Sequence, residues 1–94
     1  MEFDWDNGNI EHIARHNVSP SEAEQVLLID PIELESVSHP MDGIRIRYIG
    51  RTAKDRILIV LMTWRGDLAR IISGWDAPRA DKQIYLRATV NHYD

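Results

Sequence analysis

One stretch of the chain is apolar at six consecutive positions, and it limits the possible folds more than any other feature. Residues 57–62, Ile-Leu-Ile-Val-Leu-Met, would present apolar side chains on both faces of a strand. Such a strand lies in the middle of a sheet that is covered on both sides. Because six residues are too few to span a bilayer, the run indicates a buried strand and not a membrane segment.

The segments on either side of this run are predicted to be its neighbouring strands. Residues 44–49 alternate between apolar and polar side chains, which predicts a strand whose Ile44, Ile46 and Tyr48 face the core. After the run, the sequence Trp-Arg-Gly-Asp at 64–67 is typical of a hairpin turn and leads into a strand over 68–75. Strands joined by hairpins form an antiparallel sheet.

Three helices are predicted around these strands. Asp6 is placed to cap a helix over about residues 7–16, with Asn17 as its left-handed end. Ser19 and Glu22 have capping-box spacing at the start of a second helix, which the Asp-Pro pair at 30–31 ends. The Asp-Ala-Pro sequence at 76–78 opens a third helix that runs to about residue 90.

Two shorter strands, over residues 3–5 and about 32–37, complete the predicted order. This order is typical of the α+β class: a small antiparallel sheet with two N-terminal helices and one C-terminal helix. A length of 94 residues predicts a single domain over residues 1–94.

The composition excludes several classes of site. Cysteine is absent, so the chain has no disulfide framework, thiolate nucleophile or cysteine-ligated metal. The acidic N-terminus lacks the apolar segment of a secretory signal, so a cytoplasmic protein is expected.

The net charge of −4 is divided unevenly along the chain. Residues 1–42 carry ten Asp and Glu and one basic residue, Arg15, whereas residues 43–94 carry ten Lys and Arg and five acids. Two halves of opposite net charge favour an anion-binding surface on the C-terminal half. Pairing of the two halves as a solvated ionic surface would explain the same pattern.

Short sequences distributed along the chain, read together, resemble the BrnT family, the toxin component of type II toxin–antitoxin modules. The similarity covers about residues 3–86. The sequences are Phe3-Asp4-Trp5-Asp6, Arg15-His16-Asn17-Val18, Ala23, Asp30-Pro31, Arg47-x-Ile49-Gly50, Arg56-x-Leu58-x-Val60, Arg70-Ile71-Ile72-Ser73 and Tyr85.

The resemblance implies a compact RelE-like fold and a ribonuclease that blocks translation. It also implies a cognate BrnA-like antitoxin of the ribbon–helix–helix type that neutralises the toxin, in a heterotetramer with the antitoxin as the central dimer. The complex would repress its own operon through the antitoxin. One arginine that the family often has after the Ile-Ile pair is replaced here by Trp75.

Metal-independent cleavage of RNA uses the 2′-hydroxyl as nucleophile and needs a proton acceptor, a proton donor and cations around the phosphate. Arg47 and Arg70 are the catalytic candidates, because a guanidinium binds two phosphate oxygens at once. The candidates for RNA binding are Arg45, Arg51, Arg65 and Trp75. Alternatively, these arginines cover the sheet with their aliphatic stems and pair with carboxylates.

His16 is the candidate for proton transfer, because imidazole titrates near neutral pH. Its position at the end of a predicted helix gives an alternative role, in which the helix dipole favours its cationic form. His12 lies one helical turn earlier, but no third ligand is evident, so neither a metal nor another cofactor is predicted. His39 and His92 receive no role.

The aromatic residues allow two interpretations. Trp64 and Trp75 are predicted near the ends of neighbouring strands and could form an exposed shelf for bases or a contact for the antitoxin. Tyr48 and Tyr85 are expected to pack in the core, and Asp81 to lie in the first turn of the last helix.

The leading hypothesis is therefore a metal-independent endoribonuclease toxin that acts on RNA. The main alternative is a non-catalytic relative that binds an antitoxin and acts in operon autoregulation. A metal-dependent hydrolase built on His12 and His16 is the third hypothesis.

Overall fold

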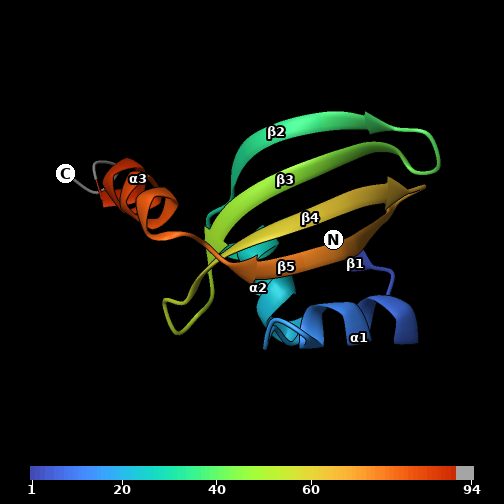
Figure 1. Cartoon of the computed structure of the whole chain (residues 1–94), viewed down its shortest axis with the longest axis horizontal. Coiled ribbons are helices and arrows are strands. Elements are labelled where there is room, and N and C mark those ends of the chain that lie inside the picture. The colour runs from blue at the N-terminus through green and yellow to red at the C-terminus, as the bar shows by residue number, and fades with distance from the viewer. Residues whose placement is uncertain (91–94) are drawn as a thin grey trace.

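A curved sheet of five strands in the order β1-β5-β4-β3-β2 forms the centre of the computed structural model, which describes residues 1–90 (Figure 1). The elements follow the predicted order. They are β1 Glu2–Phe3, α1 Asn7–Ala14, α2 Pro20–Ile29, β2 Ile32–His39, β3 Gly43–Arg51, β4 Ile57–Arg65, β5 Leu68–Asp76 and α3 Arg79–Val90.

The sheet is mixed, which corrects the prediction of a purely antiparallel sheet. Strands β2 to β5 are antiparallel neighbours as predicted. The short β1 instead pairs in parallel with β5, with Phe3 beside Ala69. It covers residues 2–3 and not 3–5, because Asp6 already caps α1 and leaves only two residues for the turn between them.

Both N-terminal helices begin as predicted, since each has a complete capping box. The Asp6 side chain accepts from the backbone N–H of Asn9, and the Asn9 side chain accepts from the N–H of Asp6. Ser19 and Glu22 form the same reciprocal pair at the start of α2. Asn17 has a φ of 58°, which confirms the predicted left-handed residue after α1.

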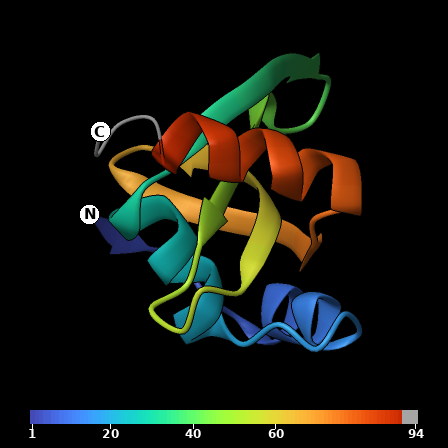
Figure 2. The same ribbon diagram turned by 90° about the vertical axis from the view of Figure 1, so that its left-hand side faces the viewer.

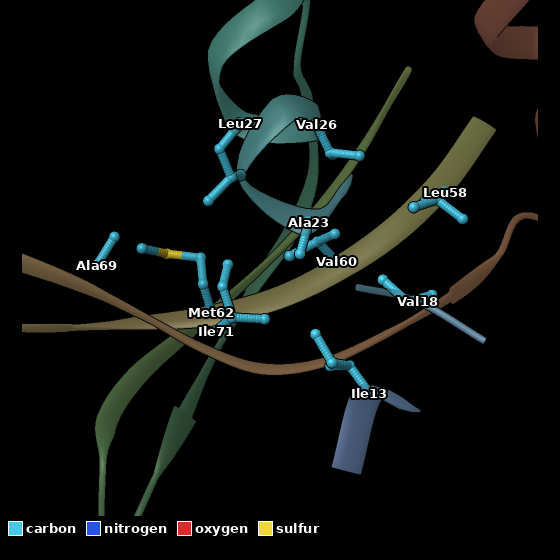
Figure 3. Close-up of a cluster of buried hydrophobic side chains, with 10 residues drawn as sticks. All are labelled: Ile13, Val18, Ala23, Val26, Leu27, Leu58, Val60, Met62, Ala69 and Ile71. Carbon is cyan, nitrogen blue, oxygen red and sulfur yellow. The ribbon is translucent and has the colours of Figure 1, made fainter. Parts of the chain in front are cut away.

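The first two helices cover one face of the sheet and enclose the main core (Figure 3). Its buried members come from α1, α2, the loop between them, β4 and β5: Ile13, Val18, Ala23, Val26, Leu27, Leu58, Val60, Met62, Ala69 and Ile71. Ile46 and Tyr48 pack against this core as predicted. Ile44 does not, being 59% exposed, because α2 packs near Gly50 at the opposite end of β3.

A second, smaller core lies on the opposite face, under α3 (Figure 2). Tyr85 of α3 is 1% exposed and packs with Ile49, Ile57, Ile59 and Ala77. Its hydroxyl donates to the carbonyl oxygen of Asp30 at 2.8 Å. The central strand β4 is thus apolar on both faces as predicted, but α3 covers only one end of its face. The rest of that face carries the candidate site.

Arg56 links three separate parts of the chain just before β4. Its guanidinium contacts both carboxylate oxygens of Asp76 at 3.0 and 3.1 Å, Glu22 at 3.0 Å and the carbonyl oxygen of Asn17 at 2.6 Å. The hydrogen bond from Arg56 lowers the pKa of Asp76. Burial opposes ionisation of Glu22, but hydrogen bonds from Ser19 and Arg56 lower its pKa overall.

We expect Arg56→Gln to lower the free energy of unfolding by about 1–2 kcal/mol at neutral pH, a discounted value because the side chain is partly exposed. A carboxyl whose folded pKa lies below its unfolded value stabilises the fold above that unfolded value. This contribution is therefore lost as the pH falls below about 4.5, the ordinary value for Glu22. Urea unfolding measured from pH 7 to pH 3 should show the difference in the free energy of unfolding between wild type and Arg56→Gln becoming smaller. A difference that stays constant over this range would contradict the assignment. Arg87→Gln on α3 serves as the control.

Candidate functional site

The five predicted arginines lie on one face of the sheet, opposite the main core, and four of them line its two hollows. On β3, Arg45 and Arg47 alternate with the core-facing Ile46 and Tyr48. Paired residues on adjacent strands share a face. The pairing of Arg45 with Thr63, and of Thr63 with Arg70, therefore forms one row across three strands. Arg65, two residues beyond Thr63 on β4, lies on the same face.

A β-bulge in β5 is what brings Arg70 to this face. Leu61 pairs with Ser73, whereas the next residue of β4, Met62, pairs with Ile71, so Ile72 is the extra residue. Without it, the alternation that places Ser73 on the open face would turn Arg70 toward the helices. Bulges re-aim side chains in this way beside functional sites.

The arginines surround a depression of about 260 Å³ that extends from this face across β5 to α1, whose Asn9 is hydrogen-bonded to the backbone of β5. Arg45, Arg65, Arg70 and Asp42 line it from the sheet side, and His12 lines it from α1. Asn9 holds α1 in place, because its buried side-chain amide donates to the carbonyl oxygens of Asp4 at 2.9 Å and Ile71 at 3.0 Å. The Ile71 carbonyl lies next to the bulge at Ile72, so the Asn9 side chain fixes both α1 and the bulged part of β5.

Carboxylates hold the arginines of the depression in place. Arg70 lies 3.0 Å from Asp6 and 3.5 Å from Asp4, which is 3.7 Å from Arg65. The Arg45 side chain forms a hydrogen-bonded ion pair with Asp42. The hydrogen bond from Arg70 lowers the pKa of Asp6 and raises the pKa of Arg70, and the bond from Arg45 lowers the pKa of Asp42.

This pairing is what the alternative interpretation of the sequence predicts. It coexists with an open depression, however, and the carboxylates of Asp4 and Asp6 are 28% and 54% exposed. A guanidinium has five N–H donors in a planar fork, so it can keep one carboxylate and still bind a phosphate oxygen.

Arg47 occupies the next row of the same face. Its guanidinium lies 3.0 Å from Glu35 of β2 and 5.9 Å from the ring centroid of Trp75 on β5. Trp75 therefore belongs to this face and packs beside the second core. Trp64 pairs with Ala69, a member of the main core, and so lies on the opposite face. The predicted shelf of two tryptophans is wrong, because antiparallel strands end at opposite ends of the sheet.

The comparison with known families matches this chain to the model described as "Ribonuclease toxin, BrnT, of type II toxin-antitoxin system", over residues 5–82. This span includes every residue that lines the depression. The chain belongs to the BrnT family. No curated protein matches the sequence.

Proteins of the BrnT family are ribonuclease toxins that have an antitoxin partner, so the site is considered as a candidate ribonuclease site. Besides Arg47 and Trp75 in the next row, two more of the predicted residues, Arg51 and His16, do not line the depression. Arg51, at the end of β3, contacts Asp55 at 3.3 Å and lies six residues from Arg45, roughly 20 Å along an extended strand. His16 follows α1, is exposed and does not line the depression.

His12, which sequence reasoning considered only as half of a metal site, is the histidine that lines the depression. Its ring centroid is 6.3 Å from that of His16. The sequence contained part of the information that places His12 here. Gly8 and His12 are four residues apart, so they lie on one side of α1, and both line the depression. The roles of Asn9, Asp4 and Asp6 depend on contacts with β5, more than 60 residues away, and no local pattern indicates them.

Within residues 1–90, no group of three or more His, Asp or Glu side chains is arranged to hold a metal ion. In the same part of the chain, none of the helices has the length and apolar character needed to cross a membrane.

Proposed function

We propose that this BrnT-family chain is a metal-independent endoribonuclease of the cytoplasm that inhibits translation by cutting RNA. The observation that carries the proposal is the depression in which three arginines and one histidine converge. Phosphate is the anion that such a fork-shaped, cationic surface binds best. Positive charge is also what the reaction needs, because negative charge grows on the phosphate oxygens in the transition state.

In the proposed reaction, Arg45, Arg65 and Arg70 hold the scissile phosphate. The 2′-oxygen attacks phosphorus while its proton passes to an imidazole, for which His12 is the better placed candidate and His16 the second. The bond from phosphorus to the 5′-oxygen breaks, and that oxygen takes up a proton from a second imidazole or from water. The products are a 2′,3′-cyclic phosphate and a 5′-hydroxyl end.

The other predicted residues have outer roles in this proposal. Arg47 and Trp75 extend the RNA-binding surface along the next row, and Arg51 would reach only a distant part of a bound strand. The proposed partner is a BrnA-like antitoxin of the ribbon–helix–helix type, in a heterotetramer that represses its own operon. A RelE-like fold over residues 1–94 belongs to the same proposal.

The test is incubation of the purified chain with a synthetic single-stranded RNA in excess EDTA, with analysis of the product ends. We expect cleavage to 2′,3′-cyclic phosphate and 5′-hydroxyl ends, and no cleavage where a single 2′-deoxy nucleotide replaces the reacting ribose. Cleavage that requires Mg²⁺, or that produces 5′-phosphate ends, would contradict the mechanism.

The alternative function is a non-catalytic, antitoxin-binding protein, and the ion pairs at each arginine of the depression favour it. Under that alternative, purified protein leaves RNA and cell-free translation intact but still forms a stable complex with the product of a neighbouring antitoxin gene. Intact RNA in both assays would therefore favour the binding role over the enzyme.

A further inference from the structure

Beside the cationic depression lies a second hollow, of about 240 Å³, on the same face of the sheet. It lies between β2, β3 and β4, and the side chains of Val37 and Leu61 give it an apolar surface. Arg45 lines both hollows, so the two adjoin at this side chain. The inference below rests on the proposed function, because it concerns the RNA that the cationic depression would hold.

The polar groups of this hollow are a matched donor and acceptor. Glu35 and Arg47 face each other on paired strands, 3.0 Å apart, and the Glu35 side chain is 49% exposed, which leaves its carboxylate accessible. The Arg47 guanidinium is flanked on another side by Trp75. Its Nε–H is buried, but the Arg47 side chain as a whole is 42% exposed, so the outer part of the guanidinium faces solvent. The pair therefore offers a carboxylate acceptor and, beside it, guanidinium N–H donors.

The spacing of the two hollows fits one nucleotide. Arg45 and Arg47 are two residues apart on β3, so their rows are separated by roughly 7 Å. A base attached to a ribose whose phosphate lies in the first row would reach the second. A base also has the right shape, because its faces are apolar and its edge is polar.

We infer that the hollow between β2 and β4 is a subsite for an unpaired nucleobase, and that it favours guanine. Guanine presents N1–H and the 2-amino group side by side, which suits the Glu35 carboxylate, and its O6 accepts from an arginine N–H. Val37 and Leu61 contact the faces of the ring. Because the edge that is read is the Watson–Crick edge, the RNA must be single-stranded at this position.

The test compares four short single-stranded RNAs that differ only in the base beside a single cleavable ribose, G, A, C or U, all other riboses being 2′-fluoro. We expect kcat/KM for the guanine substrate to exceed the others by tenfold or more. Glu35→Gln should reduce that preference by about tenfold and change cleavage of the other three substrates by less than threefold. Glu33→Gln is the matched control, because Glu33 lies in the same strand but pairs with the core-facing Tyr48.

Affinity of the fully 2′-fluoro oligonucleotides, measured by fluorescence anisotropy, separates this inference from the proposed function. Equal cleavage of all four RNAs, or a preference that Glu35→Gln leaves intact, would overturn the subsite while the ribonuclease stands. Guanine-selective binding that depends on Glu35, without any cleavage, would support the subsite and refute the enzyme. Absence of binding to all four oligonucleotides would overturn both.

Discussion

Replacing Arg70 by alanine is expected to reduce the kcat/KM for RNA cleavage by about a hundred- to a thousandfold, the effect of losing one preorganised donor at a developing charge. Arg70 is the arginine that the bulge of β5 turns toward the depression, and its side chain is only 16% exposed. Its guanidinium is therefore held in place before RNA arrives. Arg70→Lys keeps the charge but loses the planar fork of the guanidinium, so its kcat/KM should fall between those of wild type and Arg70→Ala.

The fold should survive this substitution. The carboxylates left behind, Asp4 and Asp6, are partly exposed and can be solvated. Thermal unfolding followed by circular dichroism checks this point for Arg70→Ala. The control is Arg51→Ala, at the far end of β3, for which we expect a loss of less than fivefold. Arg70→Ala activity within threefold of wild type, with an unchanged melting curve, would remove Arg70 from the site.

Gly50→Ala is expected to be the most destabilising of the small substitutions, lowering the free energy of unfolding by about 2–3 kcal/mol. A Cβ at this position would lie 2.7 Å from the carbonyl oxygen of Val26 and 2.9 Å from its Cγ1. Both atoms belong to α2, which packs on β3 at this point. The helix would have to move away from the sheet, since a backbone carbonyl cannot rotate aside as a side chain can.

Gly74→Ala provides a matched control in the same sheet. A Cβ there would meet its nearest atoms at 3.6 and 3.7 Å, which is ordinary contact. We expect Gly74→Ala to change the free energy of unfolding by less than about 1 kcal/mol, because neither a clash nor a left-handed backbone opposes it. Chemical denaturation of both variants measures the difference. Equal stabilities would show that α2 does not approach β3 as closely as described.

The parts of the fold that local physics determines could be predicted from the sequence. Two capping boxes set where α1 and α2 begin, and the Gly66 turn between β4 and β5 has the left-handed φ of 60° that a tight hairpin needs. Parallel pairing of β1 with β5 could not be predicted in this way. It brings together residues 3 and 69, and no short-range pattern determines that register.

The candidate site likewise contains residues that a local pattern places and residues that only tertiary contacts place. Alternation along β3 placed Arg45 and Arg47 on one face, because the period of a strand is fixed. The face of Arg70 depends on one extra residue in β5, which alternation alone does not reveal. The choice between His12 and His16 depends on how α1 lies against the sheet, and the buried amide of Asn9 determines that.

RNA binding in the depression can be tested most directly by an NMR titration of the protein with a single-stranded 2′-fluoro RNA that it cannot cleave. We expect saturable shifts at the backbone amides of residues 8–12 and around Arg45, Arg65 and Arg70, all bordering the depression. These shifts should weaken as salt is added, since phosphate contacts release counterions. Shifts centred on α2 or α3, or no saturable shift at low salt, would contradict the claim that RNA binds in the depression.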